Sequence, residues 1–244
     1  MSEPAVLCAI AEGLCTLTLN RPEKLNALDL AALRLLETHI DALDDDIGCI
    51  VLRGAGRSFC AGHDLNEIGE GQGEETKAIE SAIVTKLAEL DYPVIAAVQG
   101  HCLTGGLELA LAADIIVAAE SARFTDTHSR WDLVPVWGLS QRLPRRVGRA
   151  MALEMMYTGR MVDGAEAVRI GLANRCVPDA ELDAAVAALA AQILGNAPRA
   201  NRAIKRLVVE TDGMSAHDGA VHELERTAGR GSEFAERVAR WRRR

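Results

Sequence analysis

The sequence has little positive charge: its 244 residues include 27 lysines and arginines against 35 aspartates and glutamates, a formal net charge of −8. Proteins that bind nucleic acid in general carry a basic surface that displaces counterions. This balance therefore excludes a general nucleic-acid binder. The one dense basic run, 237–244, is interpreted as a solvated helix end.

Spacings typical of metal sites and disulfide frameworks are also missing. The six cysteines stand singly, with no CxxC pair, whereas such sites need ligands paired at short spacing. The first residues lack a basic stretch followed by an apolar block, and no uncharged apolar run reaches the roughly 20 residues that span a bilayer. We therefore expect no metal, no membrane contact and a cytoplasmic location.

Apolar residues make up 49% of the chain, enough for a large core. Their spacing predicts helices near 29–45, 75–90 and 106–113, the first capped by Asp29. The predicted strands are 5–10, 14–19, 50–52, 94–98 and 115–118. Strands that alternate with helices indicate parallel β/α units of an α/β fold, which bind ligands near the carboxyl ends of the strands.

The character of the chain changes near residue 179. Asp179 is expected to cap an alanine-rich helix that ends near 195, and Pro198 to open the next helix. No strand is predicted after Val177. The sequence thus divides into a core of residues 1–195 and a helical C-terminal region of residues 196–244. The apolar faces of these last helices favour oligomerisation, because a thin appendage cannot bury them alone.

Two glycine-bearing turns, 58–65 and 100–108, are the strongest functional signals. Each follows a predicted strand and offers small residues with backbone N–H groups. Two such donors could converge on a developing oxyanion, and one donor is worth about 3–4 kcal/mol of barrier. In the first turn the useful group would be the N–H of His63. Glu108, in the first turn of the following helix, either complements the helix dipole or acts as an acid or base.

These turns, taken with the segment 20–28, resemble the enoyl-CoA hydratase/isomerase (crotonase) superfamily. The resemblance covers almost the whole chain, with the motifs in the family's order. The motifs are Asn-Arg-Pro (20–22), Asn-Ala-Leu (26–28), Phe-Cys-Ala-Gly-His-Asp-Leu (59–65), Pro-Val-Ile-Ala-Ala-Val (93–98), Gly-Gly-Leu-Glu-Leu-Ala (105–110), Asp-Ile-Ile (114–116), Gln-Arg-Leu-Pro (141–144) and Thr-Gly-Arg (158–160). It implies a crotonase-like spiral of ββα turns with a helical C-terminal trimerisation region, in a homo-trimer or hexamer. It also implies acyl-CoA substrates, with coenzyme A as part of the substrate and no separate cofactor.

The resemblance assigns roles to particular residues. It places the oxyanion hole at the N–H groups of His63 and Gly105, and the first catalytic carboxylate at Glu108. The substrate and CoA contacts that it implies are Lys24, Leu25, Ala61, Asp64, Leu65, Gly106 and Trp137.

One catalytic position departs from the family pattern. Family hydratases use a second glutamate shortly after the phenylalanine that corresponds to Phe124, and an ungapped count places His128 there. A neutral imidazole titrates near neutrality and could serve as base or acid. Alternatively, His128 bonds locally and hydration is lost. Asp126 and Asp132 are nearby carboxylates that could also reach the site.

We expect an enzyme that hydrates 2-enoyl-CoA to 3-hydroxyacyl-CoA through a stabilised enolate. The alternatives are an isomerase that uses Glu108 alone, and an acyl-CoA-binding protein with little hydratase activity because His128 replaces the second glutamate. Trp137 either fills the acyl pocket, which suits a short or unusually shaped acyl group, or packs in the core. Val136 stands where the dehalogenase branch has its nucleophilic aspartate, which disfavours that chemistry.

Overall fold

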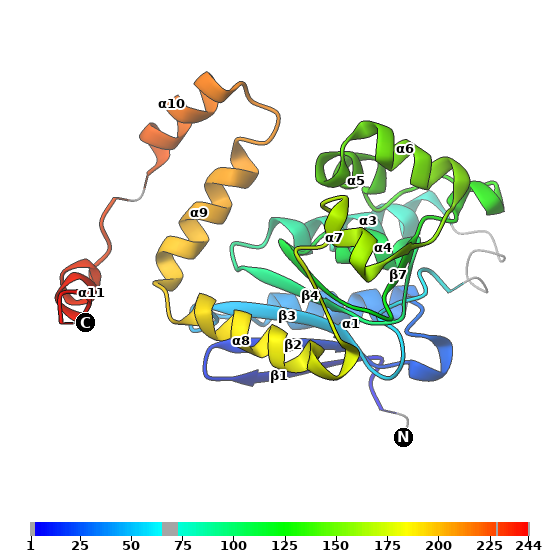
Figure 1. Ribbon diagram of the computed structural model, residues 1–244, viewed down its shortest axis with the longest axis horizontal. Helices are drawn as coiled ribbons and strands as arrows, with labels where there is room; N and C mark the ends of the chain where they lie inside the picture. The colour runs from blue at the N-terminus through cyan, green and yellow to red at the C-terminus, as the bar shows by residue number, and fades with distance from the viewer. Residues whose placement is uncertain (1–2, 65–72, 228, 244) are drawn as a thin grey trace.

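Two sheets form the centre of the protein in the computed structural model, which describes residues 3–64, 73–227 and 229–243 (Figure 1). The larger sheet has the order β1-β2-β3-β4-β6-β9 and the smaller has the order β5-β7-β8. The strands are β1 (Val6–Ala11), β2 (Leu14–Leu19), β3 (Cys49–Gly54), β4 (Val94–Val98), β5 (His101–Leu103), β6 (Ile115–Ala119), β7 (Arg123–Thr125), β8 (Val162–Asp163) and β9 (Arg175–Val177). β1 and β2, which correspond to the predicted strands 5–10 and 14–19, form an antiparallel hairpin, and every later neighbour pair of the larger sheet is parallel.

Helices cover the sheets on both faces. The described helices are α1 (Leu30–Asp41), α3 (Glu74–Glu89), α4 (Gly105–Ala110), α5 (Leu139–Val147), α6 (Arg149–Thr158), α7 (Gly164–Arg169), α8 (Leu182–Leu194), α9 (Pro198–Glu210), α10 (Ala216–Arg226) and α11 (Phe234–Trp241). Short 3-10 helices run over Pro22–Lys24, His128–Trp131 and Asp179–Glu181. None of the helices in the described part of the chain has the length and apolar character needed to cross a bilayer.

Alternating side chains of the central strands supply two cores. In β3, Ile50 and Leu52 belong to the larger core, while Cys49 and Val51 face the smaller core beneath α8. β4 and β6 divide their side chains in the same way, because successive residues of a strand point to opposite faces. The continuous apolar runs of these strands are thus explained by burial on both sides, as is usual for parallel strands covered by helices.

The caps predicted from the sequence had different outcomes. Asp29 caps α1 as expected, and its carboxylate accepts the N–H of Ala32 at 2.8 Å. The prediction for Asp179 is wrong. Asp179 lies in a 3-10 turn before α8, and its carboxylate instead accepts the N–H of Ser121 at 3.0 Å. The Asp179 carboxylate binds Ser121 in place of the helix N-terminus because the chain after β6 passes close to this turn.

Strand ends carry both glycine-bearing turns to one place. β3 leads into the turn that contains His63, and β5 leads directly into α4, which begins at Gly105. The segment that contains His128 follows β7, the parallel neighbour of β5. Because these elements end at neighbouring points, residues far apart in the sequence meet at a single site.

The last three helices form what we call the C-terminal arm, residues 198–241. Figure 1 shows α9 leaving the end of α8 and α10 and α11 lying beyond the body of the sheets. α8 itself packs on β3, β4 and β6. The division after residue 195 remains a prediction, since these contacts describe packing and do not test independent folding.

Candidate active site

The turn that contains His63 is held on both sides by backbone hydrogen bonds. On one side, the Leu28 N–H donates to the Gly62 carbonyl at 2.8 Å and the Asp64 N–H donates to the Leu28 carbonyl at 2.7 Å. On the other side, the Cys60 N–H donates to the His101 carbonyl at 2.9 Å. These bonds leave the turn little freedom to move relative to β5 and α4.

The His63 amide nitrogen and Gly105 lie side by side. A Cβ atom added at Gly105 would stand 3.2 Å from the His63 nitrogen, and one added at Gly62 would stand 3.2 Å from the Gly105 nitrogen. Gly105 is the first residue of α4, so its N–H has no acceptor within the helix. Thr104 makes the sharp turn before it with φ of 50°, a strained conformation for a β-branched residue.

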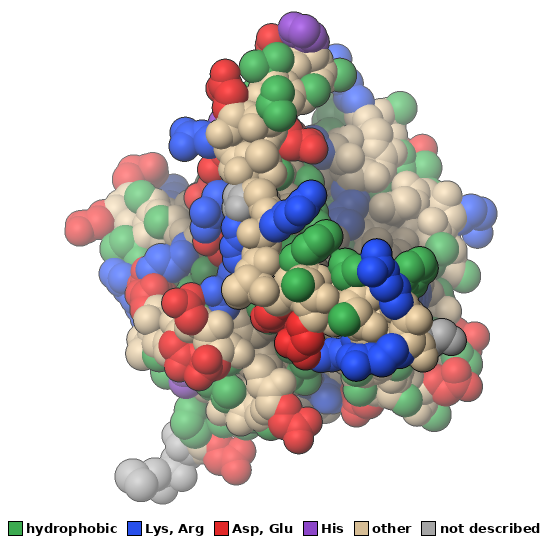
Figure 2. Space-filling view, turned by 90° about the vertical axis from the view of Figure 1, so that its left-hand side faces the viewer, with side chains coloured by type: hydrophobic (Ala, Val, Ile, Leu, Met, Phe, Trp, Pro, Cys, Tyr) green, Lys and Arg blue, Asp and Glu red, His purple; other side chains and the backbone are tan. Residues whose placement is uncertain are grey.

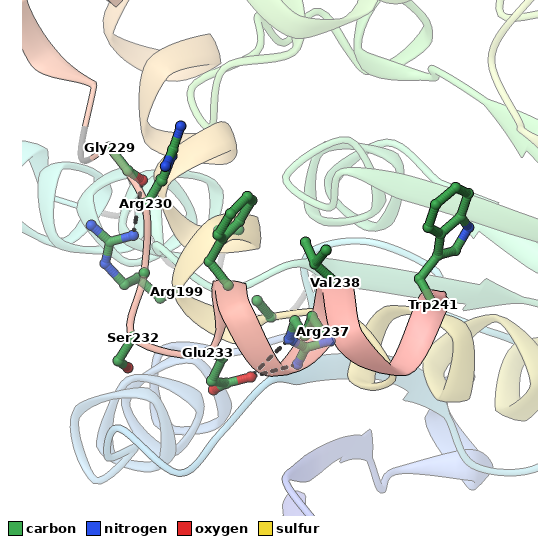
Figure 3. Close-up of a pocket in the computed structure, with 12 residues that line it drawn as sticks. Arg199, Gly229, Arg230, Ser232, Glu233, Arg237, Val238 and Trp241 are labelled. Carbon is green, nitrogen blue, oxygen red and sulfur yellow. Dashed lines mark hydrogen bonds and ion pairs between the residues drawn. The ribbon is translucent and has the colours of Figure 1, made fainter. Parts of the chain in front are cut away.

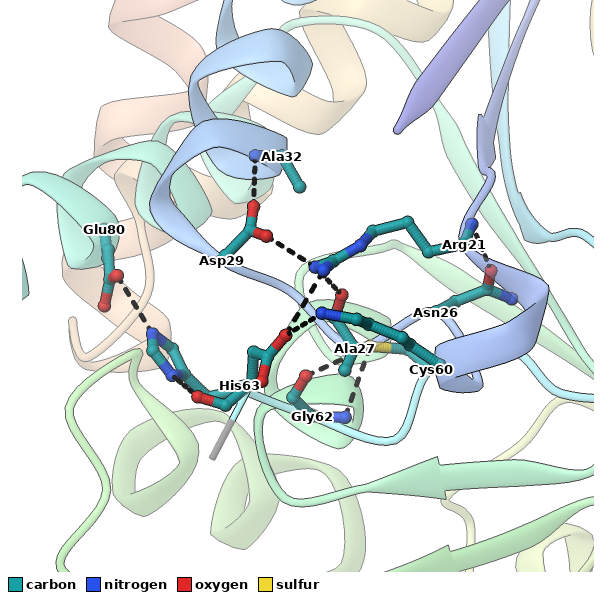
Figure 4. Close-up of polar contacts among 11 residues, drawn as sticks. Arg21, Asn26, Ala27, Asp29, Ala32, Cys60, Gly62, His63 and Glu80 are labelled. Carbon is teal, nitrogen blue, oxygen red and sulfur yellow. Dashed lines mark hydrogen bonds and ion pairs between the residues drawn. The ribbon is translucent and has the colours of Figure 1, made fainter. Parts of the chain in front are cut away.

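A polar network supports the turn from the N-terminal side (Figure 4). The Arg21 guanidinium donates to the Ala27 carbonyl at 2.8 Å and pairs with Asp29 at 2.6 Å and with Asp64 at 3.2 Å. Lys24 also reaches Asp64, with 3.0 Å between Nζ and Oδ2. The Asp64 carboxylate therefore ties segment 21–29 to the His63 turn.

Glu108 is buried with one carboxylate oxygen fixed by the backbone. Its Oε1 accepts the N–H of Trp137 at 2.9 Å and that of Leu139 at 3.1 Å. Burial raises the pKa of this carboxyl above its ordinary value. The charge of His128 and the two N–H donors oppose the rise, and Asp126 adds to it. Its other oxygen, Oε2, faces His128.

The imidazole of His128 lies between two carboxylates. Its Nε2 is 3.9 Å from Glu108 Oε2, and its Nδ1 is 2.6 Å from Asp126 Oδ1. All three residues are buried. One water molecule placed between Nε2 and Oε2 could hydrogen-bond to both, because the two atoms are separated by less than two hydrogen-bond lengths.

The His63 side chain makes a second imidazole–carboxylate contact at the same site. Its Nε2 lies 3.0 Å from Oε1 of Glu80, a buried residue of α3. The His63 ring packs on the Trp137 indole, with 5.3 Å between ring centroids. A Cβ atom at Gly105 would stand 2.6 Å from Trp137 Cζ3, so this glycine lets the indole lie on the start of α4.

These groups line one cavity of about 510 Å³. It brings together eight residues singled out in the sequence: Ala61, His63, Gly105, Glu108, His128, Asp132, Val136 and Trp137. Its rim includes the exposed apolar side chains of Trp131, Val134 and Val136. Trp137 is buried and also forms part of the cavity wall. Its role in filling an acyl pocket stays a prediction.

The other predicted contacts lie outside the cavity wall. Leu25 accepts the Ala61 N–H at 2.9 Å through its carbonyl, and Lys24 pairs with Asp64. Gly106 packs against the turn, since a Cβ atom there would stand 2.3 Å from the Cys60 carbonyl oxygen. Leu65 lies outside the described residues.

Sequence reasoning missed Glu80 and gave Asp126 no particular partner. A signal for Glu80 exists: it occupies the apolar stripe of α3 that includes Ile83, Val84 and Leu87, a position where a carboxylate needs a buried partner. The chain offers no comparable local signal for Asp126. Its contact with His128 depends on how the chain turns after β7.

Known proteins resemble this chain over most of its length. The model of the enoyl-CoA hydratase/isomerase family matches residues 9–227. The chain belongs to the enoyl-CoA hydratase/isomerase family. It is 36% identical over 197 residues to a short-chain-enoyl-CoA hydratase of Clostridium acetobutylicum, covering 78% of this chain and 76% of the relative. It is 35% identical over 209 residues to an enoyl-CoA hydratase of Mycobacterium tuberculosis, covering 82% and 79%.

Solved structures of the family share the whole fold. The crystal structure of an enoyl-CoA hydratase from Bacillus anthracis matches with a TM-score of 0.91 and 31% identity, over 98% of this chain and 96% of that one. A Thermobifida fusca protein in complex with acetoacetyl-CoA matches with a TM-score of 0.86 and 30% identity, over 91% and 93%. The crotonase fold, with two sheets and C-terminal helices, is therefore confirmed.

The raised pKa of Glu108 predicts a pH-dependent effect of Glu108→Gln on stability. Between pH 4.5, the ordinary value, and the raised pKa of Glu108, the folded protein holds a proton on this carboxyl more often than the unfolded chain does. This contribution to stability therefore falls as pH rises. Because glutamine does not ionise, the free energy of unfolding of the variant should improve relative to wild type with rising pH.

Urea unfolding at a series of pH values measures this difference. Glu225→Gln, at an exposed position of α10, is the matched control and should show no comparable trend. A difference between Glu108→Gln and wild type that stays constant over the range would contradict the prediction.

Proposed function

We propose that the protein hydrates 2-enoyl-CoA thioesters to 3-hydroxyacyl-CoA. The observation that carries the proposal is the 3.9 Å separation of Glu108 Oε2 and His128 Nε2 on the wall of a cavity that also contains His63 and Gly105. Two groups that exchange protons thus face each other beside two adjacent amides. Family membership and the acetoacetyl-CoA bound by the Thermobifida fusca relative support a thioester ligand.

In this proposal the thioester carbonyl oxygen binds between the N–H groups of His63 and Gly105. Both donors belong to rigid segments, so no reorganisation is needed as negative charge develops on the oxygen. Withdrawal of electrons toward this oxygen makes the β-carbon electrophilic and stabilises the enolate that forms when water attacks. The start of α4 adds a field that favours the same negative charge.

Glu108 and His128 would divide the proton transfers. His128 Nε2 takes a proton from the water as the water oxygen bonds to the β-carbon and the C=C π bond breaks. Glu108, which burial keeps protonated more readily than an exposed carboxyl, gives its proton to the α-carbon. The resulting imidazolium and carboxylate have facing atoms 3.9 Å apart, close enough for a proton to return and reset the pair.

The contacts of His128 favour hydration over the alternatives. An isomerase needs one base that moves a proton between the α- and γ-carbons, and Glu108 alone would suffice. A protein that only binds acyl-CoA needs neither group. A basic nitrogen beside Glu108, at the distance suited to one shared water, supports the two-group reaction.

Trp137 supports a preference for short acyl groups. Its indole packs on both His63 and Gly105, directly beside the proposed position of the thioester carbonyl. This ring occupies volume that a longer acyl chain would require.

The C-terminal arm supports a homo-oligomer, which we propose to be a trimer or a hexamer built from trimers. α9 turns two of its basic side chains inward: Arg202 pairs with Asp45 at 2.7 Å and Lys205 with Asp114 at 2.9 Å. Its outward side carries exposed apolar residues, with Ile204 61% and Val208 66% exposed. A surface helix usually buries its apolar residues instead.

α10 and α11 continue the exposed apolar surface. Leu224 of α10 is 78% exposed. Val238 and Trp241 project from one side of α11 beside a cavity of about 550 Å³ (Figure 3). Figure 2, which faces the arm, shows its hydrophobic side chains at the surface among basic and acidic ones. Exposed apolar surface of this kind marks an interaction site, and a second copy of the chain is the partner that family membership favours.

Loss of hydration in Glu108→Gln and in His128→Ala is the first functional prediction. Each change should lower kcat by about 10²–10⁴-fold, the usual contribution of a positioned acid or base. The assay is the loss of ultraviolet absorbance as the conjugated thioester of crotonyl-CoA is hydrated. Glu225→Gln is the matched control and should retain wild-type kcat. Full activity of Glu108→Gln would exclude Glu108 as the acid, and conversion of a 3-enoyl-CoA by His128→Ala without hydration would favour the isomerase.

Trp137→Ala should extend the acyl chains that the protein accepts. The change keeps the backbone N–H that holds Glu108 and opens space beside the carbonyl. Each additional buried methylene contributes about 0.8 kcal/mol. The ratio of kcat/KM for 2-hexenoyl-CoA over crotonyl-CoA should therefore rise about tenfold, because the longer acyl group has two more methylenes. Tyr157→Ala, at an exposed position of α6 outside the cavity, is the control and should leave the ratio unchanged. An unchanged ratio in Trp137→Ala would contradict a role in chain length.

Val208→Glu should break the oligomer, because it places a charge on the outward apolar face of α9. Sedimentation equilibrium should give a trimer or hexamer mass for wild type and a lower mass for the variant. Val134→Glu makes the same change at another exposed valine, outside the arm, and should leave the mass unchanged. A monomeric wild-type protein would refute the proposal.

A further inference from the structure

We propose that Asp126 is the positioning residue of this site: it holds His128 with the proton on Nδ1 and Nε2 toward Glu108, and it requires an imidazole rather than a carboxylate at position 128. The catalytic consequence rests on the proposed hydration. The orientation of the ring does not depend on that reaction and can be measured separately.

The contact between Asp126 and His128 fixes which ring nitrogen carries the proton. Asp126 Oδ1 is 2.6 Å from Nδ1 of His128, and the same oxygen accepts the backbone N–H of His128 at 3.1 Å. A carboxylate only accepts hydrogen bonds, so Nδ1 must be the donor. In a neutral ring Nε2 then carries the lone pair, and this atom faces Glu108 Oε2. The ring is thus oriented as a base is in other acid–base sites, where a third group holds the opposite nitrogen.

Side-chain hydrogen bonds of the two neighbouring threonines fix the chain on both sides of Asp126. Thr125, the residue before it, donates its hydroxyl to the Gly159 carbonyl at 2.8 Å. Thr127, the residue after it, shares a hydrogen bond of 2.6 Å with the Thr104 hydroxyl. The second contact joins this segment to the residue that precedes Gly105. The Asp126 segment is therefore joined to the same turn that presents the Gly105 amide.

The charge of Asp126 favours an imidazole over a carboxylate at position 128. A glutamate at position 128, the family pattern for hydratases, would place a third carboxylate beside Glu108 and Asp126 in a buried site. Like charges at such distances strongly oppose ionisation. An imidazole avoids this conflict, and when it accepts a proton Asp126 stabilises the charge. The departure at position 128 and the buried aspartate two residues earlier are therefore parts of one arrangement.

Four other charged residues near Asp126 and His128 are not altered by substitutions at these two positions. Arg142 of α5 donates to the Trp137 carbonyl at 2.5 Å. Burial lowers the pKa of its guanidinium, and the nearby Glu108 opposes this change. Lys77, Glu80 and Asp132 line the same cavity. Variants at positions 126 and 128 leave all four in place, so differences among those variants report the Asp126–His128 contact.

A double-mutant cycle tests the requirement for imidazole. Asp126→Asn alone should lower kcat for crotonyl-CoA about 10²–10⁴-fold with little change in KM, because Asp126 is not among the residues that line the cavity. His128→Glu alone should be similarly impaired. Combining His128→Glu with Asp126→Asn should raise kcat at least about tenfold above His128→Glu, a gain that independent sites cannot give. Equal kcat in wild type and Asp126→Asn, or no recovery in the double variant, would overturn the inference.

The tautomer of His128 provides a readout that does not depend on activity. Nitrogen-15 NMR of histidine-labelled wild-type protein, with His128 assigned by its loss in His128→Gln, should show the proton on Nδ1 at neutral pH. In Asp126→Ala this tautomer should no longer dominate. A wild-type protein without hydratase activity but with the Nδ1–H tautomer would refute the proposed function and support the orienting role of Asp126. A proton on Nε2 in the wild-type protein would overturn the inference whatever the activity.

Discussion

The site depends on the backbone hydrogen bonds that fix the turn at residues 60–64 between two neighbours. The backbone of Leu28 hydrogen-bonds to one side of the turn, and the backbone of His101 in β5 hydrogen-bonds to the other. Because β5 runs directly into α4, the same bonds set the distance between the amide of His63 and that of Gly105. Main-chain groups placed in this way cost little to hold in position. The strained turn at Thr104 then follows as the local cost of presenting the Gly105 N–H at this point.

Trp137 couples this amide pair to the acid–base pair. Its backbone N–H holds one oxygen of Glu108, while its ring packs on Gly105 and His63. A single residue therefore contacts both halves of the proposed chemistry and also limits the space for the acyl group.

The sequence indicated much of the fold because the relevant signals are local. The strands β1 and β2 and the cap at Asp29 follow from adjacent residues or from periodicity, as does the lack of strands among the residues described after Val177. Asp179 shows the limit of this reasoning. Its local context predicts a cap, but a carboxylate binds whichever donor the fold brings closest, and here that donor belongs to Ser121.

By itself the sequence determined the family and the two glycine-bearing turns, and it predicted catalytic roles for Glu108 and His128. Such features depend on the order of residues, which the chain carries before it folds. Only the tertiary structure decided that His128 lies between Glu108 and Asp126, and that the buried Glu80 meets His63. These contacts join separate elements, and hydrogen bonds act over about 3 Å. Spacing along the sequence cannot specify these contacts, since the packing of strands and helices sets the distances between the contacting atoms.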